Sequence, residues 1–146
     1  MTSLDKSSLH TKCEEKNKST LLAALRETGA ATGTVTYQGS GDSGYVEGVS
    51  IQDADDAAIN WSSTVTYCDV ESRFENGAWH PVIVEKEQPL ETALSDFAMT
   101  AVYRRHGGWE NNEGGCGNVV FDTATDVVRI EHTEYFIDSA CEETLL

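Results

Sequence analysis

The chain has 146 residues, which is typical of one domain, and 39% of them are hydrophobic. It carries 25 acidic and 10 basic residues, for a formal net charge of −15. A body of this charge should repel nucleic acid and anionic membranes. No apolar run is long enough to span a membrane, and the N-terminus lacks the apolar core of a secretory signal. We therefore expect a cytoplasmic protein that binds neither nucleic acid directly nor a membrane.

The negative charge is concentrated in one part of the sequence. Residues 1–30 hold five basic and four acidic side chains, whereas residues 31–146 hold five basic and 21 acidic ones. This distribution favours a basic protein as the partner. The same acidity is also explained by solubility alone.

The chain begins with a polar segment. Residues 1–16 have no clear hydrophobic period, and we predict a flexible N-terminal tail there. A helix is predicted over residues 17–28 from an apolar stripe that includes Leu21 and Leu25, and Gly29 is expected to end it.

Several short segments alternate β-branched or aromatic residues with polar ones, a pattern typical of strands. The predicted strands span residues 34–37, 45–51, 63–70, 73–75, 78–84, 118–122 and 127–132. The glycine-rich stretch 39–44 predicts a turn, and Asn76-Gly77 predicts a tight hairpin.

The strongest helix signal covers residues 89–106. Pro89 suits the first helical position, and two arginines favour the last turn. The core-facing stripe is Leu90, Ala93, Leu94, Phe97, Ala98, Ala101 and Val102. Gly107-Gly108 is expected to end the helix.

These elements predict an α+β fold. Because nearly all strand connections are short, we expect an antiparallel sheet of about five to six strands with two main helices on one face. The tail is followed by a single acidic domain over residues 17–146. Its acidic end, residues 134–146, is expected to dock on the body through Tyr135 to Ile137.

No catalytic set is recognised. Gly41-Asp42-Ser43-Gly44 matches the tetrapeptide around the nucleophile of trypsin-like proteases, but only His10 precedes it and the chain is too short for two barrels. A turn between two strands explains the glycines. We assign no catalytic residue and no cofactor.

Two kinds of metal site are considered, and neither is assigned. A zinc site would start from His10 and Cys13, although structural zinc ligands usually come in close pairs. Its other ligands would come from Cys68, Cys116, His132 or Cys141. A site for a hard cation would use Asp42, Glu47, Glu110, Asn112, Glu113 and Asp122. Free thiols are the preferred interpretation of the four cysteines.

The loop at residues 109–117 is the most unusual local feature. It is either a recognition surface or a helix-to-strand turn anchored by a buried Trp109, and both interpretations stay open. Other aromatic and histidine residues are given structural roles: Trp61 and Trp79 in the core or on a sheet face, and His80 and His106 as structural side chains.

The segments Tyr37–Gly44 and Gly107–Gly114, followed by Gly117 and Phe121-Asp122, resemble an uncharacterised bacterial family. That family is often associated with plasmids or phages and shares a G-D-S-G turn and a G-W-E-N-N-[D/E]-G loop. The resemblance spans residues 17–136 and implies that the two glycine-rich loops face a common site. It implies no catalytic residue, since the family has no established activity.

The favoured hypothesis is a non-enzymatic interaction protein that binds a basic partner. In its specific form, the protein is a mobile-element inhibitor or regulator that masks a nucleic-acid-binding surface by charge mimicry. The expected partner surface comprises Glu85, Glu87, Glu131, Glu134, Asp138, Glu142 and Glu143.

Two alternatives stay open. One is a metal- or small-molecule-binding enzyme or sensor that uses the two glycine-rich loops. Its candidate residues are Asp42, Ser43, Trp109, Glu110, Asn111, Asn112 and Glu113. The other is an accessory domain whose charge serves only solubility.

Overall fold

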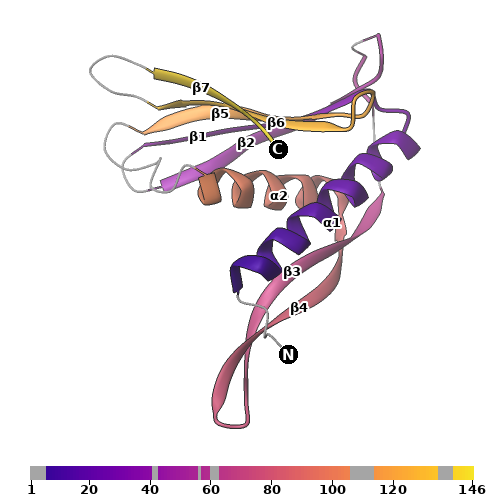
Figure 1. The fold of residues 1–146 in the computed structure, drawn as a ribbon. Helices are drawn as coiled ribbons and strands as arrows, with labels where there is room; N and C mark the ends of the chain where they lie inside the picture. Colours follow the sequence, from indigo (N-terminus) through magenta and orange to yellow (C-terminus); the bar gives the residue numbers. More distant parts are fainter. Residues whose placement is uncertain (1–5, 41–42, 56, 60–62, 106–113, 135–139) are drawn as a thin grey trace.

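The computed structural model describes residues 6–40, 43–55, 57–59, 63–105, 114–134 and 140–146. The chain order of elements is helix, four strands, helix and three strands (Figure 1). They are α1 (Lys6–Glu27), β1 (Thr32–Ser40), β2 (Ser43–Gln52), β3 (Thr64–Glu75), β4 (Ala78–Pro89), α2 (Leu90–Arg105), β5 (Gly115–Asp122), β6 (Val127–Glu134) and β7 (Ala140–Leu145).

Five of the strands form one antiparallel sheet in the order β2-β1-β5-β6-β7. The other two, β3 and β4, pair with each other and, within the described residues, form a separate two-stranded ribbon. The prediction of an α+β fold with an antiparallel sheet is therefore confirmed. The number of strands in the main sheet is five, because the hairpin of β3 and β4 leaves the sheet.

Helix α2 follows directly from the ribbon and covers one face of the sheet. It begins at Leu90, next to the Pro89 that was expected to start it, and ends at Arg105. All seven residues of the predicted stripe are buried. The periodicity of this segment therefore identified both the helix and its buried face.

Helix α1 begins at Lys6, so the prediction of a flexible tail is wrong for residues 6–16. The buried positions Leu9, Cys13, Asn17, Leu21 and Leu25 follow one another at intervals of four residues. Four residues advance the side chain by about 40° around a helix, so this stripe winds slowly from one side of α1 to another. Its N-terminal half contacts β3, and its C-terminal half enters the main core.

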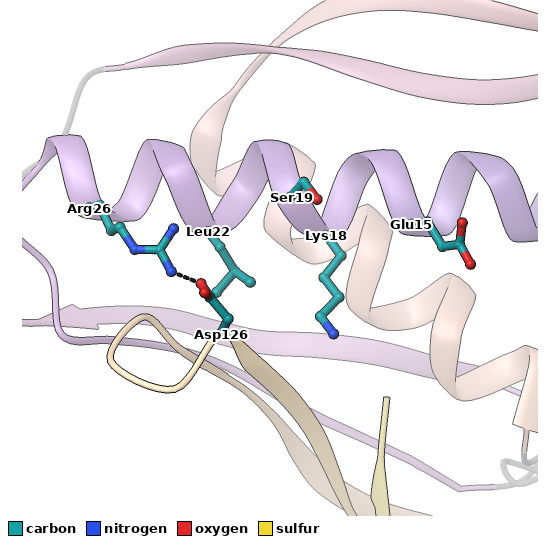
Figure 2. A pocket seen from close by; sticks show the side chains of 6 residues that line it. All are labelled: Glu15, Lys18, Ser19, Leu22, Arg26 and Asp126. Atoms are coloured by element: carbon teal, nitrogen blue, oxygen red, sulfur yellow. Dashed lines mark ion pairs between the residues drawn. The ribbon is translucent and has the colours of Figure 1, made fainter.

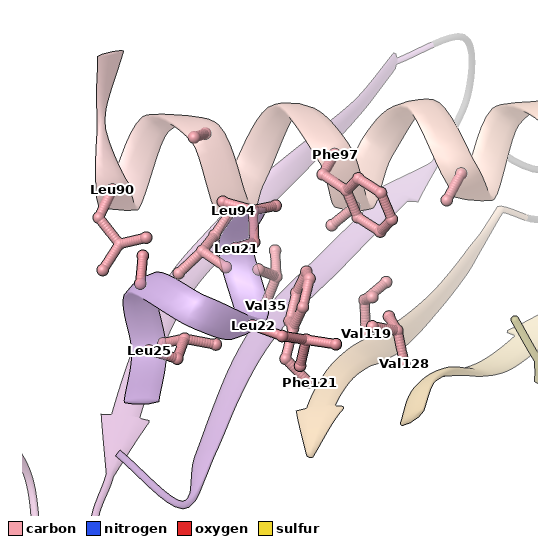
Figure 3. Packing of buried hydrophobic residues seen from close by; sticks show 14 of the residues in the cluster. Leu21, Leu22, Leu25, Val35, Leu90, Leu94, Phe97, Val119, Phe121 and Val128 are labelled. Atoms are coloured by element: carbon pink, nitrogen blue, oxygen red, sulfur yellow. The ribbon is translucent and has the colours of Figure 1, made fainter. Parts of the chain in front are cut away.

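The core lies between both helices and one face of the five-stranded sheet (Figure 3). Leu21, Leu22 and Leu25 of α1 point into it beside Leu94 and Phe97 of α2. The sheet contributes the buried residues Val35, Tyr37, Val119, Phe121, Val128 and Ile130. The opposite face of the sheet is not covered by either helix (Figure 1).

The end of α1 follows the sequence-based expectation. Gly29 has a φ of 85°, and its N–H donates to the Arg26 carbonyl at 3.0 Å. The next N–H, of Ala30, donates to the Leu25 carbonyl at 2.9 Å. These two bonds form a Schellman motif, which satisfies carbonyl groups that a helix end leaves without intrahelical partners.

Candidate functional site

The ribbon of β3 and β4 is the most prominent surface feature of the molecule. Each strand has 12 residues, and the turn end extends beyond both helices (Figure 1). Asn76 and Gly77 form the predicted turn, with φ values of 52° and 80°. Both values are positive, as a type I′ turn requires, so Asn-Gly fixes the register of the ribbon.

The projecting half of the ribbon has two chemically different faces. Directly opposite residues share a face, and the faces alternate along the strands. One face carries the apolar pairs Val70–Ile83 and Phe74–Trp79, with Pro81 between them. The other face carries Asp69, Glu71, Arg73 and Glu75 on β3, opposite Val84, Val82, His80 and Ala78 of β4. An apolar stripe on one face of a solvated ribbon is the pattern of a surface that another molecule covers.

Two aromatic rings stand at the tip of the apolar face. Phe74 is 60% exposed and Trp79 is 69% exposed, and their ring centroids lie 5.4 Å apart at an interplanar angle of 61°. The prediction that Trp79 lies in the core or on a sheet face holds only for the sheet face. His80, the next residue in β4, is also exposed and lies on the other face of the ribbon.

The charged residues of the ribbon are mostly acidic. Its two strands hold two cations, on Arg73 and Lys86, and five carboxylates. The carboxylates are Asp69, Glu71, Glu75, Glu85 and Glu87. Apolar contact area and negative charge therefore occur together on one projecting element.

The base of the ribbon is attached to α1 by a buried polar contact. The Asn17 side chain donates to the Cys68 carbonyl at 2.7 Å, and its oxygen accepts from the Cys68 N–H at 2.8 Å. One turn earlier in α1, the Cys13 Sγ lies 2.6 Å from the Cys68 Sγ. Burial, and then the hydrogen bond with Cys68, raise the pKa of the Cys13 thiol to about 12.

Three further groups at the ribbon base have shifted pKa values. Burial raises the pKa of the Tyr67 hydroxyl, and the negative charge of nearby Asp96 adds to the shift. Burial also raises the pKa of Asp96 above its usual value, although a hydrogen bond from Gln88 opposes that shift. On the exposed side, Lys16 of α1 pairs with Glu85, and this hydrogen bond raises the pKa of Lys16.

The two helices are linked by a carboxylate between two arginines. Glu14 of α1 pairs with both Arg104 and Arg105 at the end of α2, the latter at 2.7 Å. This contact and the Asn17 contact leave α1 fastened to α2 on one side and to β3 on the other. The orientation of the ribbon is therefore set by the helices and not by the five-stranded sheet.

A hollow of about 430 Å³ lies between α1 and the turn that joins β5 to β6 (Figure 2). Its charged residues are Glu15, Lys18, Arg26 and Asp126. Arg26 pairs with Asp126 and donates to the Thr123 carbonyl at 3.0 Å, while Lys18 donates to the Leu146 carbonyl oxygen at 3.1 Å. Both cations are engaged within the protein, so this hollow has no assembled anion site.

A buried tyrosine–histidine pair lies under the middle of the sheet. The Tyr37 hydroxyl is 2.5 Å from the His132 Nδ1, and the two rings stack. A Cβ added at Gly117 would lie 2.5 Å from the Tyr37 hydroxyl oxygen. The last glycine of the loop singled out in the sequence therefore makes room for this pair and has a packing role.

The structure does not bring the expected partner surface together as one patch. Glu85 and Glu87 lie on the ribbon, whereas Glu131 and Glu143 are opposite each other on the uncovered face of the main sheet. The remaining strand positions in the set are Glu134 of β6 and Glu142 of β7, and Asp138 lies outside the described residues.

Most of the loop-site candidates belong to segments outside the part of the chain that the structure describes. Asp42 and residues 109–113 lie outside the described residues, and Ser43 begins β2. Trp61, His106 and the docking residues Tyr135 to Ile137 also lie outside them. A common site for the two glycine-rich loops therefore stays a prediction.

Of the residues considered for metal sites, Cys13 and Cys68 meet, and His10 lines the same small hollow. Asp122 accepts the Ala124 N–H at 3.0 Å and so caps its own turn. Within the part of the chain that the structure describes, no three His, Cys, Asp or Glu residues are grouped to hold a metal ion.

Sequence reasoning missed the central features of this site. Strand alternation was visible at 73–75 and 78–80, but nothing in it showed that the ribbon would leave the sheet. The signal for Asn17 was its place four residues after Cys13 and four before Leu21. Because Asn17 is polar, it interrupts the apolar stripe, and the first part of helix α1 was not recognised from the sequence.

The architecture defines an α+β protein with a projecting antiparallel ribbon. A family model matches residues 13–144, and the chain belongs to that family, DUF6878, a family of unknown function. This confirms the expectation of an uncharacterised family. No curated protein and no solved structure matches the chain significantly. None of the helices in the described part of the chain has the length and apolar character of a membrane span.

Proposed function

We propose that this protein is a non-enzymatic interaction protein that docks on a basic protein through the β3–β4 ribbon. The observation that carries the proposal is the exposed apolar face of the ribbon, with Phe74 60% and Trp79 69% exposed, while the other face of the same strands carries the carboxylates Asp69, Glu71 and Glu75. Exposed aromatic anchors of this kind supply much of the binding energy at protein interfaces.

Charge selects the class of partner. The chain carries a formal charge of −15, so a second copy is repelled while a basic surface is attracted over a distance of about one Debye length. A two-stranded ribbon is also narrow enough to enter a groove. The specific form of the proposal is therefore a cytoplasmic inhibitor or regulator that occupies the groove in which its partner binds nucleic acid.

In this role, the carboxylates replace phosphate groups and the aromatic tip provides contact area. Glu71, Glu75 and Glu87 are exposed or half-buried along the ribbon. Complementary charges at the rim of an interface mainly increase the association rate, whereas buried aromatic rings slow dissociation. Binding should therefore weaken steeply as salt is added, and free nucleic acid should compete for the partner.

Site-specific photo-crosslinking in the native host tests this proposal. A photoreactive amino acid replaces Trp79 in one protein and Tyr45 in a matched control, since Tyr45 of β2 is also exposed at 52%. We expect position 79 to crosslink to one basic protein that position 45 does not capture. That partner should bind the purified wild-type protein and lose at least about 30-fold in affinity when Trp79→Ala is introduced.

Equal crosslinking from both positions would contradict the proposal, as would a captured partner that binds Trp79→Ala as tightly as wild type. If the protein instead formed a dimer with a second copy of itself and bound no other protein, the occupant of the ribbon surface would be that second copy, and the proposal would be overturned. Analytical ultracentrifugation of the purified protein makes that distinction, and the proposal expects a monomer.

A further inference from the structure

We propose that Cys13 and Cys68 form a reversible disulfide that fastens helix α1 to the base of the ribbon. Their Sγ atoms are 2.6 Å apart, closer than sulfur atoms that are merely in van der Waals contact and approaching the S–S bond length of about 2.0 Å. The fold therefore brings the two sulfur atoms next to each other, although the residues are 55 positions apart in the chain. This inference does not depend on the proposed function.

The surrounding contacts hold that geometry. Asn17 lies one turn after Cys13 on α1 and forms two hydrogen bonds with the backbone of Cys68, at 2.7 and 2.8 Å. Beside it, Lys16 pairs with Glu85, the residue directly opposite Cys68 in the ribbon. These contacts hold helix α1 against the ribbon next to the thiol pair, and so keep the two sulfur atoms close together.

The other two cysteines are not arranged for such a bond. In the sheet register, Cys116 of β5 lies opposite Thr133 of β6, and Cys141 of β7 lies opposite the same residue. Two strand spacings separate their backbones by about 9.6 Å, which is beyond the range a disulfide spans. Cys116 and Cys141 therefore do not offer a second pair.

A small peroxide is the oxidant that suits this site. Both thiols are buried, with 5% and 3% exposure, and the hollow that they line has a volume of about 30 Å³. The thiolate is the form that reacts, and the pKa of the Cys13 thiol is raised to about 12, so oxidation should be slow at neutral pH and faster at alkaline pH. One thiol loses its proton and takes an oxygen atom from hydrogen peroxide, giving a sulfenic acid and hydroxide, and the hydroxide combines with the lost proton as one water. The second thiol then displaces hydroxide from that sulfur, so the S–S bond forms and a second water leaves.

The oxidised form should be the more stable one. The two cysteines are 55 residues apart, and a crosslink over such a span restricts the unfolded chain. Reduction by a dithiol returns both hydrogens and restores the free thiols. In a reducing cytoplasm the two cysteines would stay as free thiols until peroxide accumulates.

The experiment uses purified full-length protein treated with hydrogen peroxide after full reduction. We expect intact-mass spectrometry to show the loss of two hydrogen atoms, and peptide mapping to show one crosslink, between Cys13 and Cys68. The melting temperature should rise by about 5–10 °C and return after reduction. The control Cys116→Ser/Cys141→Ser should behave as wild type, and Cys13→Ala should form no crosslink.

Cys13→Ala alters a buried position, so circular dichroism checks whether this variant folds. If the variant does not fold, the peptide map of the wild-type protein alone tests for the crosslink. Free thiols at both positions after treatment of folded protein would overturn the proposal. A crosslink that joins other cysteines, or oxidation that lowers the melting temperature, would overturn it as well.

Discussion

Tyr67 and Cys13 show how burial at a single residue becomes a property of the whole fold. Both lie at the base of the ribbon, Tyr67 against α2 and Cys13 against β3. Burial favours the neutral form of each, so the pKa of both groups is raised, that of Cys13 from 9.0 to about 12. Protonation of these two groups therefore favours the folded state, and their ionisation favours the unfolded chain.

This gives a prediction for alkaline pH. Above pH 9 the unfolded chain begins to lose the Cys13 proton, while the folded protein keeps it until about pH 12. The raised pKa of the Tyr67 hydroxyl acts in the same direction. The free energy of unfolding of the reduced protein should thus be fully maintained below pH 9 and fall as the pH rises. Urea unfolding midpoints measured from about pH 8 to about pH 11 provide the test.

The matched control for this test is Tyr67→Phe, which keeps the buried ring and removes the ionisable hydroxyl. Its midpoint should decline less steeply with pH, because the Tyr67 hydroxyl no longer contributes while Cys13 still does. A midpoint that stays constant or rises over the same range in wild type would refute the assignment of these two groups.

At the scale of elements, the ribbon is separate from the core that stabilises the fold. Its buried side chains lie near the base, whereas residues 72–80 are exposed on both strands. Glu71 and Val82 are directly opposite each other. Replacing residues 72–81 with Asn-Gly would therefore close a shorter ribbon with the same type of turn.

We expect this shortened protein to fold with a melting temperature within about 3 °C of wild type, because it removes no buried residue. It should no longer bind the partner, since Phe74 and Trp79 are gone. Thermal unfolding followed by circular dichroism measures the melting temperature. Titration with the partner protein that the crosslinking identified measures the loss of binding. Unfolding of the shortened protein would show that the distal ribbon is structural.

The elements also show what the sequence could predict. Helix α2 was recognised nearly to the residue because seven apolar positions follow one helical stripe. The Asn76-Gly77 turn was recognised because a two-residue hairpin turn requires positive φ at both positions, and Asn and Gly adopt such values readily. Strand β7, Ala140–Leu145, was missed because it has no alternating pattern, and it is formed through pairing with β6.

The candidate site was less accessible to prediction. Alternation reveals that residues 73–80 form a hairpin, but the choice between joining a sheet and projecting from it depends on contacts far away in sequence. Asn17 and Cys68 are 51 residues apart, and no local pattern links them. The acidic excess was visible, whereas its division between the ribbon and the main sheet required the tertiary structure.

For the whole molecule, the question is whether the charge of −15 acts at one place or as a general coat. Carboxylates stand on the ribbon and also on the uncovered face of the five-stranded sheet. A general coat would serve solubility, and any three of its carboxylates would be equivalent for binding. If the protein docks through the ribbon, the ribbon carboxylates contribute more to the binding affinity than the carboxylates on the sheet.

The most direct test compares two proteins that each lack three negative charges. One carries Glu71→Gln, Glu75→Gln and Glu87→Gln on the ribbon. The other carries Glu47→Gln, Glu131→Gln and Glu143→Gln on the main sheet. We predict that the partner's affinity falls at least about tenfold for the ribbon set and changes less than about twofold for the sheet set, measured at constant salt. Equal losses for the two sets, or a larger loss for the sheet set, would contradict docking through the ribbon.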